Sequence, residues 1–383
     1  MKKKYSRDEF DILLDVGKNF RKHKRSIKKV QRAIINRQPT LLDSPERIRA
    51  YLKRETLREL QKVMVDNNFE NPLTTASRNE DETEALESFD QAEEALIEKI
   101  DALDVSDDIT FERLIGGTND LLSIETLELG LDIARSVGLV RMEPFGRGTG
   151  FLVGLNIMMT NWHNIPDIET ARRSKFVLDF EENDLGARKQ AQEFKLDPDK
   201  FYVSDPEFDF ALVAVKPQNR LRKALIDYGT HQLIEEEGKI IVGQPVNIIQ
   251  HPKGERKKVT VHNSILVELS NDDVEDQFCY YSADTLKGSS GAPVYNNRWE
   301  VIALHRKGVP ETDNNGKILL KTGRKIDRHE MAANEADIKW VCNQGVRTSR
   351  IIRQLKDMEI DNPEYMKVRD ELLEFWGVED LMV

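Results

Sequence analysis

Hydrophobic residues recur at helical spacing in the first hundred residues of the chain. Between residues 10 and 34 many of them fall three, four or seven positions apart, which places them on one face of a helix. Ser44 followed by Pro45 supplies an N-cap and a first-turn proline for a second helix. A third stretch with the same period lies between residues 83 and 103. The pattern predicts an α-helical N-terminal region over residues 1–110.

From about residue 137 the pattern changes to short apolar runs, rich in β-branched residues and separated by glycine, proline and asparagine. Such runs at close spacing predict an all-β barrel or sandwich. Helical spacing returns near the end, in residues 348–355 and 363–376. The clearest predicted strands are Gly150–Thr160, Phe210–Val215, Val246–Ile249, Pro293–Tyr295 and Trp299–Leu304.

Charge is sorted along the chain. The 57 Lys and Arg residues against 68 Asp and Glu residues give a net charge of −11, which disfavours a protein that coats nucleic acid with its whole surface. Residues 1–65 hold 19 basic and 8 acidic side chains, whereas residues 66–113 hold 3 and 16. We expect a basic segment over 1–65, an acidic segment over 66–110 and a connecting helix over 111–137.

Composition narrows the class of protein. The 39% hydrophobic and 33% charged content is typical of a soluble globular protein. No apolar run approaches the roughly 18 residues of a membrane helix, and the N-terminus lacks the apolar core of a signal peptide. Cys279 and Cys342 are too few for a disulfide framework, and the seven histidines show no metal-ligand spacing. We therefore expect a cytoplasmic protein with reduced cysteines, no membrane contact, no metal and no cofactor.

The segment from Lys287 to Val294 carries the most specific motif, Gly-x-Ser-Gly-x-Pro. Glycines beside a serine let the backbone turn so tightly that the N–H groups of Gly288 and Ser290 point at one spot next to the Ser290 hydroxyl. Such a pair of donors is an oxyanion hole, which stabilises the negative oxygen formed in acyl transfer. A glycine- and serine-rich turn without chemistry is the alternative for the motif taken alone.

Two upstream residues complete a set of catalytic groups. His163 follows one apolar run, and Asp209 directly precedes another. A serine hydroxyl needs a base to become nucleophilic, and the imidazole needs a carboxylate that fixes its tautomer. Asp205 and Glu207 are alternatives, but Asp209 is favoured because the strand that follows it would bury its side chain. The order His163, Asp209, Ser290 is that of the chymotrypsin triad.

Six phrases of the sequence support a wider resemblance. In their order along the chain they resemble segments of bacterial trypsin-like serine peptidases of the glutamyl-endopeptidase type: Gly148–Val153, Thr160–His163, Asp209–Val213, Val246–Pro252, Asp284–Pro293 and Val301–His305. The resemblance implies a mainly β, trypsin-like double β-barrel over residues 138–355, with the catalytic cleft between the barrels and a C-terminal helical tail over 356–383. It also implies hydrolysis of peptide bonds through an acyl-enzyme.

The resemblance suggests how the substrate side chain is chosen. His305 matches the histidine that binds an acidic side chain in glutamyl endopeptidases, Thr285 matches a hydroxyl residue on the pocket wall, and Arg306 adds positive charge nearby. Asp284 lies six residues before Ser290, where trypsins carry the aspartate that binds Arg or Lys. We favour cleavage beside an acidic or small polar residue, with a basic residue as the alternative.

Ser289 departs from the trypsin pattern. Trypsin carries an aspartate at this position, which pairs with the new N-terminus after activation. Without that carboxylate we do not expect residues 113–117 to be an activation site, although Arg113-Leu-Ile-Gly-Gly resembles one. Ser289 is better interpreted as a loop residue whose side chain forms a local hydrogen bond.

The N-terminal region is expected to regulate the peptidase. Nine basic residues lie between positions 18 and 37. They are expected to associate with the acidic residues 80–108, and a regulatory protein partner would bind residues 1–110; direct binding of nucleic acid is the less favoured alternative. Residues 111–134 resemble a lead-in of bacterial intracellular trypsin-like proteins with helical adaptors, which implies a stress or antiviral defence pathway; an ordinary connecting helix is the alternative.

The favoured function is therefore that of an intracellular serine endopeptidase acting on a protein substrate. A catalytically silent peptidase-fold binding module and a nucleic-acid-responsive sensor are the alternatives.

Overall fold

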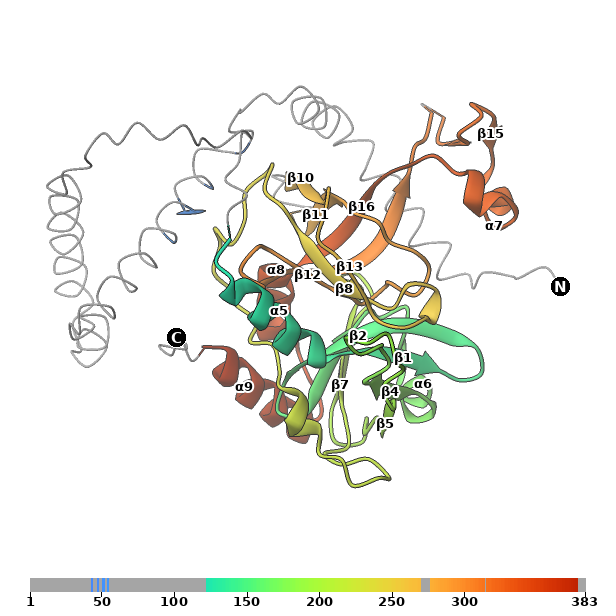
Figure 1. Ribbon diagram of the computed structural model, residues 1–383. Coiled ribbons are helices and arrows are strands. Elements are labelled where there is room, and N and C mark those ends of the chain that lie inside the picture. Colours follow the sequence, from blue (N-terminus) through green and yellow to red (C-terminus); the bar gives the residue numbers. More distant parts are fainter. Residues whose placement is uncertain are drawn as a thin grey trace, which may run out of the picture.

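The computed structural model describes residues 122–269, 276–313 and 315–377, together with Asp43, Arg47, Ala50, Tyr51 and Arg54. The predictions for the basic and acidic segments lie outside the described residues except at those five positions, of which the last four are helical. Two seven-stranded antiparallel sheets form the body of the described chain, the first drawn in green and the second in yellow to red (Figure 1).

The first sheet comes from residues 137 to 214, and its strand order is β5-β4-β1-β2-β3-β7-β6. A short helix, α6 (Ile168–Arg173), connects β3 to β4, and Asp167 caps it by accepting the Thr170 N–H. The strands are β1 (Val137–Met142), β2 (Gly146–Gly154), β3 (Ile157–Thr160), β4 (Lys175–Leu178), β5 (Gln192–Lys195), β6 (Tyr202–Asp205) and β7 (Phe210–Ala214).

Successive residues of the central strands enter two different hydrophobic cores. Phe151 and Val153 pack into the large core that the two sheets share, whereas Leu152 between them packs inside the first sheet. Phe210 and Ala211 on β7 divide in the same way. Because side chains alternate between the faces of a strand and both faces are covered, these strands have continuous apolar sequences rather than alternating ones.

The predicted strand Gly150–Thr160 is in fact a hairpin of β2 and β3. Leu155 and Asn156 have φ values of 50° and 59°, the left-handed pair that a two-residue hairpin turn requires. Asparagine is common in such a turn and leucine is not. The turn was missed because Leu155 continues the apolar run.

The second sheet comes from residues 247 to 347, and its order is β10-β11-β16-β13-β12-β8-β9. Its longest strand, β13, pairs with β16 from Ala303–Arg347 to Pro310–Trp340. The strands are β8 (Asn247–Gln250), β9 (Lys258–Thr260), β10 (Ile265–Leu269), β11 (Phe278–Ser282), β12 (Pro293–Tyr295), β13 (Val301–Pro310) and β16 (Trp340–Arg347).

A small hairpin projects from the second sheet between β13 and β16 (Figure 1). It has its own apolar cluster, which includes Ile318, Ile326 and Met331. Its elements are β14 (Ile318–Leu319), β15 (Lys325–Ile326), α7 (Met331–Asn334) and the 3₁₀ turns Arg328–Glu330 and Glu335–Asp337; two further 3₁₀ turns, Leu225–Tyr228 and Pro252–Gly254, lie in loops of the main body.

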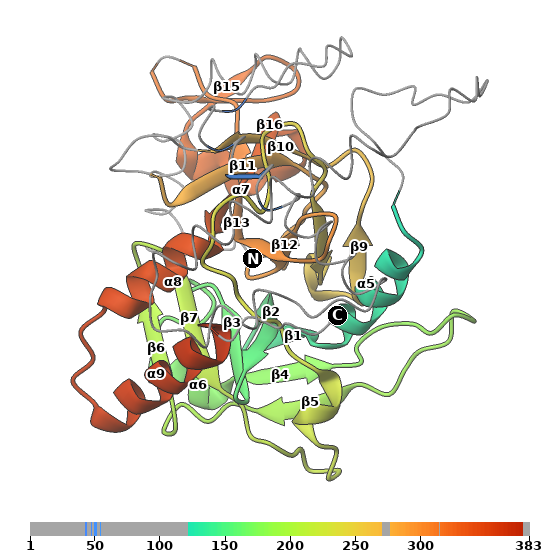
Figure 2. The same ribbon diagram turned by 90° about the vertical axis from the view of Figure 1, so that its left-hand side faces the viewer.

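Three helices complete the described chain: α5 (Glu125–Arg135), α8 (Thr348–Asp357) and α9 (Pro363–Gly377). Figure 2 shows α8 and α9 on one side of the molecule and α5 on the other. The indole of Trp376 on α9 donates to the Val153 carbonyl at 2.7 Å, and the indole of Trp299 donates to Thr126 on α5 at 2.7 Å. These bonds fix α9 to β2 and α5 to the turn between β12 and β13.

The prediction of a mainly β fold is confirmed, and its strands form the two seven-stranded sheets. The predicted helices at the C-terminal end of the chain are present as α8 and α9, and α5 lies within the predicted connecting helix. None of the helices in the described part of the chain has the length and apolar character needed to cross a membrane.

Candidate active site

His163 and Asp209 meet because their strands are neighbours. β3 and β7 pair antiparallel, with Thr160 opposite Ala211, so the residues just beyond this end of the ladder lie together. The Nδ1 atom of His163 is 2.9 Å from Oδ2 and 3.0 Å from Oδ1 of Asp209, and the His163 backbone N–H donates to Oδ1 at 3.1 Å. The carboxylate therefore holds the proton on Nδ1 and leaves Nε2 available as a base.

Asp209 is fully buried and has a φ of 50°. Aspartate is one of the few residues that adopt this left-handed conformation, and the Asn161 side chain donates to the Asp209 carbonyl at 2.9 Å. Burial by itself would raise the pKa of this carboxyl, but the charges and hydrogen bonds of His163 and Arg306 outweigh it and hold the pKa below its usual value. The carboxylate stays ionised.

Arg306 contacts the carboxylate, not a substrate pocket. Its Nε atom is 3.1 Å from Oδ2 of Asp209, and its Nη1 atom is 3.3 Å from the amide oxygen of Gln344. The guanidinium carbon lies 5.1 Å from the ring centre of Phe278, and only 2% of Arg306 is exposed. The expectation that Arg306 adds charge where substrate binds is wrong, because its side chain points from β13 into the interior.

Ser290 lies in the turn before β12, at the meeting of the two sheets. Its carbonyl accepts the Thr149 N–H from β2 at 2.8 Å and the side-chain amide of Asn164, next to His163, at 3.1 Å. Its hydroxyl donates to the Arg306 carbonyl at 3.3 Å. Among the described residues no hydrogen bond joins the Ser290 hydroxyl to His163. The fold thus brings the predicted triad to one place, with the hydroxyl bonded to β13.

The serine turn depends on two glycines. Gly288 has a φ of 99°, and a Cβ there would come within 2.7 Å of the His251 carbonyl oxygen and the Gly254 nitrogen. Gly291 has a φ of 87°, and a Cβ there would come within 2.1 Å of the Thr149 carbonyl oxygen. Only glycine fits either position.

The N–H groups of the turn divide into two kinds. The Ser289 N–H donates to the Leu286 carbonyl at 2.9 Å, and the Gly291 N–H donates to the His305 carbonyl at 3.0 Å. In the described part of the chain, the Gly288 and Ser290 N–H groups, which the sequence assigns to an oxyanion hole, have no such acceptor. Two donors next to the hydroxyl are what an acyl-transfer site requires.

Ser289 behaves as predicted. Its side chain is fully buried, and its hydroxyl accepts the Leu286 N–H at 3.1 Å. This bond and the Ser289 backbone bond close the same turn from both sides, so the side chain before the nucleophile position has a local structural role.

The three residues predicted to bind the substrate side chain differ in burial. His305 is 3% exposed, its Nδ1 lies 2.7 Å from the Tyr281 hydroxyl, and burial lowers its pKa to about 3, which leaves the ring neutral. Thr285 donates from its hydroxyl to the side-chain oxygen of Asn343 at 2.7 Å. Asp284 is exposed, and its carbonyl accepts a hydrogen bond from Gln250 at 2.9 Å.

Sequence reasoning missed Asn343. Its amide nitrogen donates to the Ala283 carbonyl at 2.7 Å while its oxygen accepts from Thr285, and it pairs with Gly308 across β13 and β16. Asn343 is 58 residues from Thr285 in the chain. The only local signal is a polar Asn-Gln pair next to the apolar residues 340–342 of the strand, which does not indicate a partner.

The described residues contain no group of three or more side chains placed to hold a metal ion. Cys279 and Cys342 are free and buried. Burial raises the pKa of Cys279 to about 12 and raises that of Cys342 as well, which agrees with their interpretation as unreactive core thiols.

Comparison with known proteins agrees with this fold. Residues 148–304 match the family model described as the trypsin-like peptidase domain, and this chain contains a domain of that fold. A curated protein of Sinorhizobium fredii (strain NBRC 101917 / NGR234), "Uncharacterized protein y4fB", is 33% identical over 262 residues. The match covers 64% of this chain and 39% of that protein, so the chain matches about two fifths of its relative's length.

Two solved structures are similar at low identity. The Rv3671c protease of M. tuberculosis H37Rv, in an inactive form, is 16% identical with a TM-score of 0.37, and the match covers 60% of this chain and 92% of that one. Deg5 is 20% identical with a TM-score of 0.36, and the match covers 49% of this chain and 87% of that one.

Proposed function

We propose that the protein is a serine endopeptidase in which Ser290 is the nucleophile, His163 the general base and Asp209 the residue that orients His163. The observation that carries the proposal is the fixed position of His163, whose Nδ1 is bonded to a buried, ionised Asp209 while the neighbouring Asn164 is bonded to the Ser290 carbonyl. This constellation has the roles that acyl transfer to a serine requires.

In the proposed reaction the Ser290 hydroxyl first leaves the Arg306 carbonyl and turns to Nε2 of His163. The bond it leaves is 3.3 Å long and neutral, so its loss costs about 0.5–1.5 kcal/mol. The oxygen attacks the carbonyl carbon of the scissile peptide as Nε2 takes its proton, and the Gly288 and Ser290 N–H groups bind the negative oxygen. His163 then protonates the leaving amine, and water hydrolyses the acyl-enzyme by the same steps in reverse.

A fluorophosphonate probe tests the assignment, since it phosphonylates a serine only when a base and an oxyanion hole activate it. We expect one adduct on the full chain, located at Ser290 by peptide mass spectrometry and lost in Ser290→Ala. Ser289→Ala is the matched control, because it removes a neighbouring hydroxyl outside the triad. A protein that takes up no probe, at any pH at which it is folded, would instead be a peptidase-fold binding module.

We further propose cleavage beside acidic or small polar residues. A neutral histidine has one N–H; with the Tyr281 hydroxyl donating to Nδ1 of His305, that N–H lies on Nε2 and can donate to a substrate carboxylate. Thr285 and Asn343 add polar side chains to this proposed binding site for the substrate side chain. Digestion of a proteome-derived peptide library by wild type and Ser290→Ala measures the preference; cleavage mainly after Lys or Arg would favour Asp284 as the determinant and reject this role of His305.

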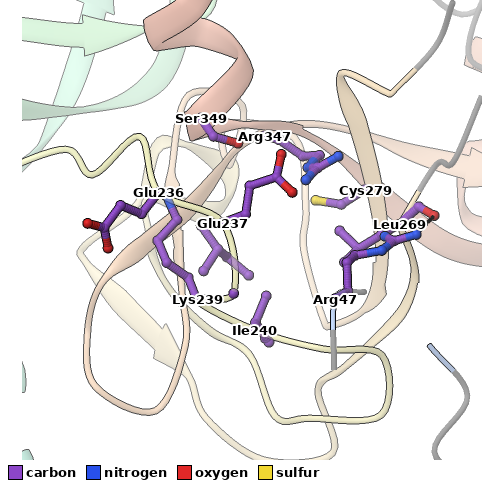
Figure 3. Close-up of a pocket in the computed structure, with 11 residues that line it drawn as sticks. Arg47, Glu236, Glu237, Lys239, Ile240, Leu269, Cys279, Arg347 and Ser349 are labelled. Carbon is purple, nitrogen blue, oxygen red and sulfur yellow. Dashed lines mark hydrogen bonds between the residues drawn. The ribbon is translucent and has the colours of Figure 1, made fainter. Parts of the chain in front are cut away.

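We also propose that the N-terminal region regulates the peptidase. Its support is a set of contacts on the second sheet, beside a small pocket that Arg47 lines with Glu236, Lys239 and Ile240 (Figure 3). Arg54 binds both carboxylate oxygens of Glu300, at 2.8 and 3.0 Å, with 12% of each side chain exposed.

A charge swap tests the regulation. We expect Arg54→Glu to raise the labelling rate of the full chain, because it repels Glu300, and the addition of Glu300→Arg to restore the wild-type rate. Arg324→Glu, on the exposed β14–β15 hairpin, controls for a change in net charge. Wild-type labelling rates in Arg54→Glu and in Glu300→Arg made alone would reject regulation through this contact.

A further inference from the structure

Arg306 contacts two residues of the proposed triad: its side chain contacts Asp209, and its carbonyl accepts a hydrogen bond from the Ser290 hydroxyl. It thus links the carboxylate and the nucleophile of the proposed triad from one point on β13. We propose that Arg306 is a positioning residue of the active site, whose buried cation holds Asp209 against His163 and extends the active range to lower pH. This inference rests on the proposed function.

The Arg306 guanidinium is buried next to the Asp209 carboxylate. A guanidinium is always charged in proteins, and a charge removed from water needs a partner of opposite sign. Gln344, fully buried on β16, accepts from Nη1 and donates to the Tyr280 hydroxyl at 3.0 Å, but it is neutral. The Asp209 carboxylate, 3.1 Å from Nε, supplies a negative charge in direct contact with the guanidinium.

The hydrogen bonds fix the orientation of the carboxylate. Oδ1 of Asp209 accepts the backbone N–H of His163, whereas Oδ2 lies between Nδ1 of His163 and Nε of Arg306, at 2.9 and 3.1 Å. Rotation of the carboxylate would break bonds to both residues at once. Loss of Arg306 would leave Oδ2 with His163 alone and would free Asp209 to turn.

The Arg306 charge also opposes protonation of Asp209, because it is one of the charges that hold the pKa of this carboxyl below its usual value. A protonated Asp209 could no longer orient His163 or stabilise its charged form. Among the described residues, His305 is a further titratable group near His163, and burial together with the charge of His163 lowers its pKa to about 3. Asp205, at the end of β6, is bonded to Gln354 at 2.7 Å and to backbone N–H groups. A neutral side chain at position 306 would therefore let Asp209 take up a proton at a higher pH than in the wild type.

The test is the pH profile of fluorophosphonate labelling on the full chain. In Arg306→Gln we expect the midpoint of the acidic limb to rise by about one pH unit, with a lower plateau rate because Asp209 is less constrained. Arg306→Lys keeps the charge, and we expect its midpoint to stay at the wild-type value. Arg347→Gln removes another buried arginine of the second sheet, which pairs with Asp276 at 3.6 Å, and should leave the midpoint unchanged.

The outcomes separate the inference from the proposed function. An unlabelled wild type rejects the proposed function. A labelled wild type with the same midpoint in folded Arg306→Gln rejects the inference alone, as does an equal rise in Arg347→Gln. If Arg306→Gln does not fold, Arg306→Lys decides: a wild-type midpoint supports a charge effect, and a raised midpoint overturns it.

Discussion

Replacement of Gly288 by alanine should separate the chemistry of the serine turn from its conformational strain, because the chain contains a matched control. Gly288 and Gly243 have nearly the same φ, 99° and 98°. A Cβ at Gly288 would come within 2.7 Å of two backbone atoms, those of His251 and Gly254, whereas a Cβ at Gly243 would have nothing within 4 Å. Both variants carry the strain of a left-handed alanine, and only one carries a clash.

The two costs can be compared. A side chain forced into a sparsely populated backbone region costs about 1–3 kcal/mol, and each kcal/mol lowers the unfolding midpoint of a domain of this size by roughly 2–4 °C. At Gly288 the clash is with backbone, so the peptide itself must move and its N–H leaves the oxyanion position. One such donor is worth about 2.7–4 kcal/mol, or a factor of about 100 to 1,000 in rate.

Thermal unfolding and the rate of fluorophosphonate labelling measure both effects on the same samples. We expect the thermal unfolding midpoint of Gly243→Ala to lie a few degrees below that of the wild type, because of the backbone strain alone. Its labelling rate should equal that of the wild type. Gly288→Ala should unfold lower still and lose about two to three orders of magnitude in labelling rate. The reasoning is refuted if folded Gly288→Ala labels as fast as Gly243→Ala, since the Gly288 N–H would then not contribute to the oxyanion hole.

Two further predictions concern stability. Trp376→Phe removes the indole bond to the Val153 carbonyl, so it should cost about 1–3 kcal/mol by urea unfolding, whereas Trp340→Phe, at a residue 43% exposed, should stay within roughly 0.5 kcal/mol. Burial lowers the pKa of His231 to about 4 and that of His251 and His305 to about 3. Below about pH 6.5 the unfolded chain therefore binds up to three more protons than the folded chain, and the free energy of unfolding falls as the pH falls, by up to about 4 kcal/mol per pH unit. Urea unfolding at pH 7, 6 and 5 measures this dependence, and a slope that corresponds to the uptake of less than about one proton would contradict it.

Local sequence was enough to predict much of the fold and most of the candidate site. Apolar runs located β7, β8 and β12 to within a residue or two, because a strand with a core on each face must be apolar throughout. The positions of His163 and Asp209 followed from the ends of such runs. The glycines around Ser290 indicated a tight turn, and the turn has the positive φ values that only glycine adopts readily.

Contacts between distant segments could not be predicted in this way. Arg306 follows directly on His305, so the sequence placed both near the substrate, but alternate residues of a strand face opposite sides. Thr285 follows β11, so its partner Asn343 depends on the register of β11 against β16, and the partner of Trp376 lies 223 residues away. The few residues around a position determine neither the face of the strand on which its side chain lies nor the distant residue that it contacts.

The serine turn belongs to the second sheet but is held by the first. Thr149 on β2 donates its backbone N–H to the Ser290 carbonyl and its hydroxyl to the Gly288 carbonyl, at 2.8 Å in each case, and its hydroxyl accepts the His251 N–H at 3.0 Å. The Gly288 peptide and the Ser290 backbone are therefore fixed by the same residue of the opposite sheet, which also carries His163 and Asp209. A shift of one sheet against the other would move the nucleophile and the N–H donors together, away from the base. The interface between the sheets is for this reason part of the candidate site, and Thr149 and Asn164 are the residues whose hydrogen bonds connect it to Ser290.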